Sequence, residues 1–250
     1  MKKLIALLLL LVLLCLLYPG VRQSLVPPAA APEEGETSSG EAQKTEKPLE
    51  TGESISAEGK DPAMAEEELP ADTDFVRVRD YIPSIAVSLR YATEDNFTGE
   101  IIYDFSEAYL RYGTVKKLSA AQAALNEAGY GLLLWDAFRP VSAQFTLWEV
   151  CPDPVYVADP NRGFSSHSRG STVDVTLITL EGEAVEMPTD FDDFTDRADR
   201  DYSDVSENAA ANALLLEQVM TASGFAPYQG EWWHFSDTDA YEVEQSFSPA

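Results

Sequence analysis

Residues 165–177 read Ser165-Ser166-His167-Ser168-Arg169-Gly170-Ser171-Thr172-Val173-Asp174-Val175-Thr176-Leu177. The first half is a polar loop in which Gly170 can supply a turn. From Val173 onward apolar and polar side chains alternate, as they do along a β-strand. His167 and Asp174 lie seven residues apart, a gap that suits a loop running into this strand. The segment therefore predicts a strand that begins beside a polar site.

The chain has two histidines, and the second ends the motif Glu231-Trp232-Trp233-His234. Neutral imidazole and carboxylate are ligands that Zn²⁺ accepts, and a catalytic zinc takes three such ligands and leaves one position for water. His167, Asp174 and His234 would supply that set, which predicts one zinc ion per chain. The alternative is that each histidine has only a structural role.

Glu231 precedes His234 by three residues and is the candidate general base. A water molecule bound to zinc needs a nearby carboxylate to take its proton and pass it to the leaving amine. In a regular strand, positions 231 and 234 would point to opposite faces, so Glu231 must lie at an irregular strand start to face the metal. Otherwise Glu231 is a solvated charge and the two tryptophans are core residues.

The elements that we expect after residue 74 do not alternate regularly between strand and helix. Three helices are expected: one capped by Thr114 and stopped by Gly129, one from Pro140 to about Glu149, and one from Glu207 to Ser223, before Gly224. Three strands are expected over residues 131–135, 173–177 and 231–235. This order predicts an α+β fold with a small antiparallel sheet flanked by helices.

Composition excludes some classes of protein. With 43 acidic and 17 basic side chains the net charge is -26, whereas nucleic-acid recognition and polybasic membrane binding need a basic surface. After Tyr18 no aromatic residue occurs until Phe75, so residues 75–250 are expected to form one folded domain. Cys151 is the only cysteine of that domain, and we interpret it as a buried apolar residue rather than a nucleophile.

The first 74 residues divide into two segments. Lys2-Lys3 followed by the uncharged, leucine-rich residues 4–21 is typical of an export signal. Because that apolar run is just long enough to span a bilayer, we expect residues 1–22 to be a membrane anchor. The rest of the chain would then lie outside the cytoplasm. The alternative is a cleaved signal peptide and a secreted protein. Residues 23–74 are rich in Glu, Ala, Pro, Ser and Thr, which predicts a disordered acidic linker.

Several motifs resemble one known family. The pattern Ser-x-His-x-x-Gly-x-x-x-Asp followed by Glu-Trp-Trp-His is similar to that of the D-alanyl-D-alanine dipeptidase family, the VanX-type zinc D,D-peptidases. The resemblance extends over roughly residues 75–240 and includes further segments: Arg90-Tyr91-Ala92-Thr93, Asn96-Phe97-Thr98-Gly99, Gly131 to Pro140, Phe191-Asp192 and Gly224-Phe225.

The resemblance implies a fold, an activity and residue roles. The fold is the zinc D-Ala-D-Ala peptidase (hedgehog-like) fold, and the activity is hydrolysis of the D-Ala-D-Ala dipeptide in cell-wall peptidoglycan metabolism. His167, Asp174 and His234 would bind zinc, with Glu231 as catalytic base. Arg139 would steady the charged tetrahedral intermediate, unless it only forms a surface ion pair with Asp136. The implied substrate contacts are Asp192 for the ammonium group, Ser165 near the carboxylate, and Tyr91 and Tyr103 in the pocket.

The sequence departs from the family pattern near the substrate pocket. Met187-Pro188 stands where Met-Gly is usual, residues 197–202 lack the usual Ser-His, and Asn212-Ala213 replaces an Asn-Arg pair. Two alternatives therefore stay open: a D,D-carboxypeptidase that trims peptidoglycan stems, and a wall-binding module without catalysis. A carboxyl group at position 192 favours the dipeptidase, because a dipeptide has a free ammonium group to bind.

Overall fold

A computed structural model describes residues 68–154 and 156–249 of the chain. Its centre is a five-stranded sheet in the order β2-β4-β5-β7-β6. The strands are β2 (Ala86–Val87), β4 (Tyr130–Asp136), β5 (Thr172–Thr179), β6 (Phe225–Pro227) and β7 (His234–Asp237). A separate two-stranded sheet pairs β1 (Phe75–Arg77) with β3 (Tyr109–Arg111). The α+β prediction is confirmed.

The prediction of a purely antiparallel sheet is wrong in one respect. β4, β5, β7 and β6 pair antiparallel, but β2 runs parallel to β4, so the sheet is mixed. β2 is only two residues long and is followed by irregular chain and a short 3-10 helix, η2 (Arg90–Ala92). A strand of that length has no alternation that could reveal it in the sequence.

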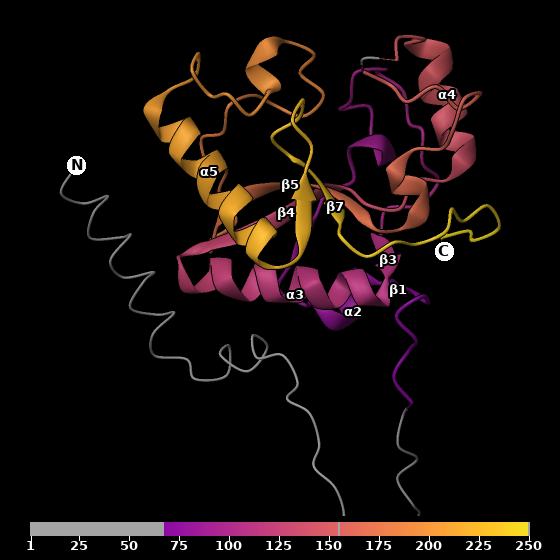
Figure 1. Cartoon of the computed structure of the whole chain (residues 1–250), viewed down its shortest axis with the longest axis horizontal. Coiled ribbons are helices and arrows are strands. Elements are labelled where there is room, and N and C mark those ends of the chain that lie inside the picture. Colours follow the sequence, from indigo (N-terminus) through magenta and orange to yellow (C-terminus); the bar gives the residue numbers. More distant parts are fainter. Residues whose placement is uncertain (1–67, 155, 250) are drawn as a thin grey trace, which may run out of the picture. The chain divides into compact units, whose positions relative to one another are not determined.

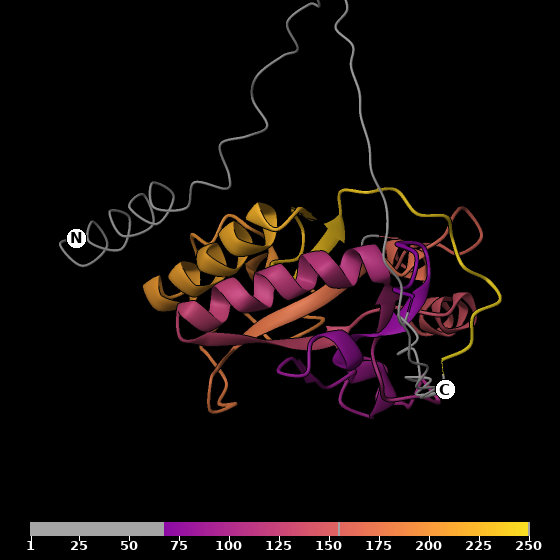
Figure 2. The ribbon, with the colours of Figure 1, turned by 90° about the horizontal axis from the view of Figure 1, so that it is seen from below.

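Helices α3 (Tyr112–Glu127) and α5 (Glu207–Ala222) lie side by side over the sheet (Figures 1 and 2), and they contact each other and the strands beneath. Val115, Leu118 and Leu125 recur at helical spacing on α3 and are fully buried. Gly129 (φ +88°) and Gly224 (φ +96°) follow the two helices in the left-handed conformation that ends a helix. These two helices cover the sheet, and both contact its strands.

The remaining helices are short or lie apart from α3 and α5. Helix α4 lies on the opposite side of the domain from α5 (Figure 1). The bounds are Val78–Tyr81 for α2, Val141–Val150 for α4, Ser166–Arg169 for η3 and Asp196–Ala198 for η4. Cys151 follows α4 directly and is partly buried against the core, as expected of an apolar residue.

Two predicted boundaries need correction. α3 begins at Tyr112, and Thr114 is not its cap: the Thr114 hydroxyl donates to the Asp237 carboxylate at 2.7 Å. The last strand begins at His234 rather than at residue 231, so Glu231 precedes it in an irregular turn. The irregular position that Glu231 needs in order to face the site is therefore present.

The predicted segments 1–22 and most of 23–74 lie outside the described residues. Between residues 68 and 249, position 155 excepted, no helix is long and apolar enough to cross a membrane.

Candidate active site

Three neighbouring strands place functional side chains in one row across the sheet. Asp174 on β5 pairs in register with Asp136 on β4 and with His234 on β7. Residues directly opposite each other on adjacent strands project to the same face of a sheet. The register shifts between Leu134 and Asp136, and this irregularity brings Asp136 into the row. The row Asp136–Asp174–His234 is thus set by backbone pairing.

His167 reaches the row from the short helix η3. The Ser165 hydroxyl caps this helix by accepting from the His167 backbone N–H at 3.3 Å. Gly170 ends it with φ +70°, and a side chain at position 170 would collide with the ring of Phe75. The predicted turn at Gly170 is therefore confirmed, and two constraints require glycine there.

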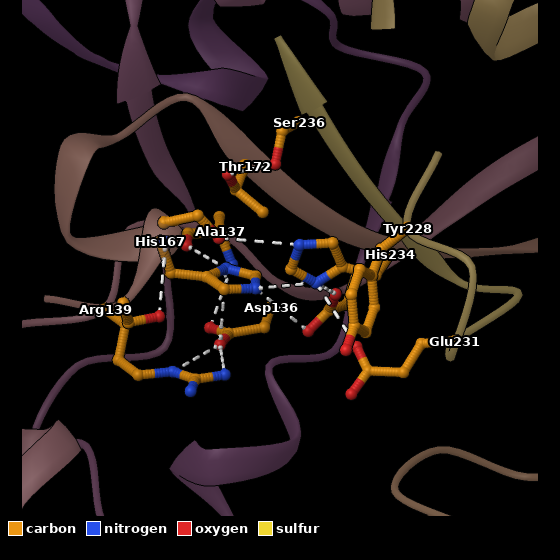
Figure 3. A network of polar contacts seen from close by, with 12 residues as sticks. Asp136, Ala137, Arg139, His167, Thr172, Tyr228, Glu231, His234 and Ser236 are labelled. Carbon is orange, nitrogen blue, oxygen red and sulfur yellow. Dashed lines mark hydrogen bonds and ion pairs between the residues drawn. The ribbon is translucent and has the colours of Figure 1, made fainter. Parts of the chain in front are cut away.

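The imidazole of His167 is held in one tautomer. Its Nδ1 donates to the Ala137 carbonyl at 2.9 Å, which leaves Nε2 without a proton and facing the site. Nε2 lies 3.3 Å from Asp174 Oδ2. It also lies 3.4 Å from Nδ1 of His234 (Figure 3). Ligand atoms of His167, Asp174 and His234 all lie within 4.8 Å of one another.

The donor set fits a bound cation. Asp174 Oδ1 is buried, and within the described residues no donor meets it in good hydrogen-bond geometry, although His234 Nδ1 lies 3.0 Å away. A buried carboxylate oxygen without a donor is costly unless something else neutralises it. Two imidazole nitrogens and a carboxylate facing one point form the three-ligand set of a catalytic metal site. The part of the chain that the structure describes thus holds a candidate metal site at His167, Asp174 and His234.

Neighbouring groups of opposite charge shift the pKa values of Asp174 and His167. Burial raises the pKa of Asp174, but the neighbouring His167 and His234 outweigh burial and bring it well below the ordinary value. Burial lowers the pKa of His167, and the carboxylates of Asp174 and Asp136 reverse this so that the net shift is upward.

Arg139 forms an ion pair with Asp136, and its backbone N–H donates to the His167 carbonyl. The Asp136 Oδ2 atom accepts from Arg139 Nε at 3.0 Å and Nη2 at 2.7 Å, while Arg139 Nη1 donates to Gln144 at 2.9 Å. Both members of the pair are buried, so the alternative of a surface ion pair is wrong. The Ser168 hydroxyl donates to the Arg139 carbonyl at 2.9 Å, which joins the arginine loop to η3.

The row opens into a cavity of about 250 Å³ that is lined by Arg139, the three candidate ligands and two further carboxylates. These are Asp192 and Glu231, and burial raises the pKa of each to about 7. Glu231 Oε2 lies 3.4 Å from His234 Nδ1, on the side of His234 away from Arg139 (Figure 3). Asp192 accepts from the Tyr91 hydroxyl at 2.8 Å and has φ +54°. Asp192 thus lines the cavity and is held there by the Tyr91 hydroxyl.

Three of the four predicted substrate contacts line this cavity: Ser165, Tyr91 and Asp192. Tyr103 does not. It is buried against Tyr91, with ring centroids 5.6 Å apart, and its hydroxyl donates to Asp136 at 2.8 Å. Tyr103 thus supports the Arg139–Asp136 pair from behind the cavity wall.

Sequence reasoning missed the central position of Asp136. Its carboxylate accepts from Tyr103, Arg139 and the Ala137 backbone N–H, and Oδ2 lies 3.6 Å from His167 Nδ1. A carboxylate at the end of a buried strand, directly before an arginine loop, was the available signal. The Gln144 contact with Arg139 had none, because Gln144 lies on an otherwise ordinary helix.

Two imidazoles and a carboxylate at a cavity wall, beside two protonatable carboxylates and a fixed guanidinium, define the site of a metal-dependent peptidase. Comparison with known proteins agrees. The profile of the Peptidase M15 family, described as D-ala-D-ala dipeptidase, matches residues 71–249. The chain belongs to this family and is a metallopeptidase of the D-Ala-D-Ala dipeptidase type.

Individual relatives carry the same description. A D-alanyl-D-alanine dipeptidase of Escherichia coli (strain K12) is 37% identical over 163 residues, which is 65% of this chain and 84% of that protein. A D-alanyl-D-alanine dipeptidase of Enterococcus faecalis (strain ATCC 700802 / V583) is 34% identical, and the match covers 67% of this chain and 93% of that protein. A D-alanyl-D-alanine dipeptidase of Streptomyces coelicolor (strain ATCC BAA-471 / A3(2) / M145) is 37% identical, and the match covers 65% of this chain and 91% of that protein.

Proposed function

We propose that this enzyme hydrolyses D-Ala-D-Ala with one zinc ion held by His167, Asp174 and His234, in the zinc D-Ala-D-Ala peptidase (hedgehog-like) fold. Nitrogen and carboxylate donors suit zinc, and a three-ligand set leaves a position for water or substrate. When bound, zinc would supply Lewis-acid polarisation of the scissile carbonyl and lower the pKa of water at the site. The single observation that carries the proposal is the convergence of the three ligand atoms beside Glu231.

Glu231 is proposed as the group that moves the proton. It faces the site from the turn before β7, with Oε2 3.4 Å from His234 Nδ1. It would take a proton from the attacking water and donate it to the amine of the departing D-alanine. In the metal-free chain, burial raises the pKa of this carboxyl group to about 7, toward the range in which a side chain can both accept and donate a proton.

Arg139 is proposed to stabilise the negative charge that develops on the carbonyl oxygen. Three of its five N–H donors are engaged by Asp136 and Gln144, which fixes the guanidinium in the cavity wall and leaves two donors. A preorganised cation needs no reorganisation when charge develops in the transition state. Asp136 holds Arg139 and keeps its pKa well above the ordinary value against the effect of burial.

Asp192 is proposed to bind the free ammonium group of the dipeptide, with Ser165 near the substrate carboxylate and Tyr91 in the pocket wall. Asp192 is partly buried, and Tyr91 is the one side chain in the described structure that donates a hydrogen bond to its carboxylate. An arriving ammonium group would neutralise Asp192 and form a charge-assisted hydrogen bond. The small cavity, below the roughly 300–1,000 Å³ of sites for drug-sized ligands, suits a dipeptide.

The test compares D-Ala-D-Ala with a pentapeptide that ends in D-Ala-D-Ala, using the full chain stripped of metal by a chelator and then supplied with zinc. We expect activity on the dipeptide to return at about one zinc per chain, with little turnover of the pentapeptide. Preferred release of D-alanine from the pentapeptide would instead support the D,D-carboxypeptidase alternative. Full activity of the stripped protein without added metal would refute the metal assignment.

We also propose that the catalytic domain works outside the cytoplasm, tethered to the membrane by residues 4–21 through the acidic segment 23–74. The support is sequence alone: Lys2-Lys3, then an uncharged apolar run, then a long polar segment. There the substrate would come from peptidoglycan. Protease added to intact cells should release an active fragment of about the size of residues 75–250, whereas complete protection until lysis would place the domain inside.

A further inference from the structure

Arg200 is a nearly fully buried cation that plays no part in the chemistry proposed above. It follows η4, and only 2% of its side chain is exposed. Nε donates to the Tyr228 carbonyl at 2.7 Å and Nη2 to the His234 carbonyl at 3.0 Å. The guanidinium lies over the ring of Phe235, 4.5 Å from its centroid. One side chain thus binds the backbone on both sides of Glu231.

The segment between those two carbonyls, which we call the 228–234 turn, carries the proposed base and ends at a proposed ligand. It is irregular from Tyr228 to Trp233. Its backbone is also held by the same neighbouring segment: Arg200 N–H donates to the Gln229 carbonyl at 3.2 Å, and Trp232 N–H donates to the Ala198 carbonyl at 2.9 Å. The path of the turn therefore depends on residues 198–200.

Glu231 needs this external support because no hydrogen bond within the described residues fixes its carboxylate. Among residues 68–249, position 155 excepted, its one polar contact joins Oε2 to His234 Nδ1 at 3.4 Å. The direction in which Glu231 points is consequently set by the backbone of the turn. Tyr228, at the start of the turn, lies beside the imidazole of His234 (Figure 3), with ring centroids 5.6 Å apart, so a shift of the turn would also move the surroundings of the ligand.

Arginine is suited to this position. Its planar fork can bind two carbonyl oxygens at once, which the single ammonium group of lysine does less well. Its charge is balanced on the opposite side by Glu217 of α5, whose Oε2 accepts from Nη1 at 3.0 Å. The contacts of the guanidinium thus form two groups. The carbonyl half consists of the hydrogen bonds from Nε and Nη2 to the turn, and the ion-pair half consists of the bond from Nη1 to Glu217 of α5. The two halves can be tested separately.

We infer that Arg200 is a positioning residue for catalysis: through the Tyr228 and His234 carbonyls it holds Glu231 and His234 in the geometry that the reaction needs. The inference rests on the role proposed for Glu231. Arg200 acts through the turn and does not contact the cavity, so it should affect the chemical step more than the binding of the dipeptide.

The experiment compares Arg200→Met with Glu217→Gln in the full, zinc-loaded chain. Arg200→Met removes both halves, whereas Glu217→Gln removes the partner's charge and leaves the carbonyl contacts. We expect Arg200→Met to lower kcat for D-Ala-D-Ala about thirty- to a hundredfold, the size of effect that a displacement of about 1 Å can have, with KM changed less than about threefold. Zinc should transfer to a chelator at least about tenfold faster. Glu217→Gln should change kcat and zinc transfer by less than about twofold.

Arg200→Lys covers the case in which Arg200→Met does not fold. It keeps the charge beside Glu217 but loses the fork, and we expect it to lower kcat at least about tenfold in folded protein. A kcat within threefold of the unmodified enzyme in either folded Arg200 variant would overturn the inference. So would an equal loss in Glu217→Gln, or a loss confined to KM. Failure of the Glu231 assignment is a separate result, since Glu231→Gln would then retain activity whatever Arg200 does.

Discussion

Asp174 and Asp192 line the same cavity, yet their pKa values shift in opposite directions. Asp174 lies on β5 between two imidazoles, which hold its pKa well below the ordinary value. Asp192 lies on a loop in the left-handed conformation, receives one neutral donor from Tyr91, and has a pKa of about 7 because of burial. Glu231, on the turn before β7, resembles Asp192 rather than Asp174.

The difference follows from which part of the fold carries each group. Paired strands bring cationic or cation-binding partners next to Asp174 and keep it ionised, as a metal ligand must be. The loops leave Asp192 and Glu231 largely desolvated beside other carboxylates, so each can exchange a proton near neutral pH. The sheet thus provides a fixed charge, and the loops provide groups whose charge can change.

The largest effect should come from removing one of the two imidazoles that keep Asp174 ionised, which are also proposed metal ligands. His167→Ala or His234→Ala should abolish binding of about one zinc per chain and lower activity by roughly 10³-fold or more, because a metal supplies several kcal/mol of transition-state stabilisation. Metal analysis of the purified variants measures the first effect. As a control, metal-stripped unmodified protein should regain activity with zinc. Stoichiometric zinc in either variant would show that the ligand set is wrong.

On the loop side, Glu231→Gln keeps the size of the side chain but cannot carry a proton. We expect zinc content to remain near one per chain while kcat falls at least about a hundredfold, the lower end of general acid–base contributions. Loss of zinc together with activity would erase the distinction between ligand and base. Near-normal turnover with full zinc would assign proton transfer to another group.

Asp192 should govern the choice between free and capped substrate. Acetylation of the ammonium group of D-Ala-D-Ala removes a charge-assisted hydrogen bond and should lower kcat/KM about thirty- to a thousandfold, equivalent to about 2–4 kcal/mol. Asp192→Asn should narrow this gap chiefly by impairing the free dipeptide. Steady-state kinetics with both substrates and both proteins measure the gap. Equal turnover of the two substrates by the unmodified enzyme would contradict the role of Asp192.

The smallest effect concerns the stability of metal-free protein. The pKa of Asp192 is higher in the folded state, about 7, than in the unfolded chain, so the folded state binds the proton more tightly. Its contribution is therefore present below about pH 4 and is lost as the pH rises to about 7. Between those values, Tm of the unmodified metal-free protein should decrease relative to Tm of Asp192→Asn, by at least a few degrees. Parallel Tm profiles would show that Asp192 is solvated.

The residues that could be predicted from the sequence are those whose chemistry or local spacing is distinctive. The two histidines, the turn at Gly170 and the strand through Asp174 belong to this group. Asp136 and Arg200 do not, because their partners are distant in sequence: Tyr103 precedes Asp136 by 33 residues, and His234 follows Arg200 by 34. Thr114 was misjudged for the same reason, since its hydroxyl binds Asp237, 123 residues away.

With the metal site proposed above, the row Asp136–Asp174–His234 would make metal content depend on correct strand alignment. If β5 paired one residue out of step with β4 or β7, its backbone could still form a ladder, but Asp174 would point to the opposite face of the sheet. Such a molecule could have a normal content of secondary structure and still lack the third ligand. In a metal-saturated preparation, the ratio of bound metal to chain would therefore report the fraction of molecules in which β5 has the correct register.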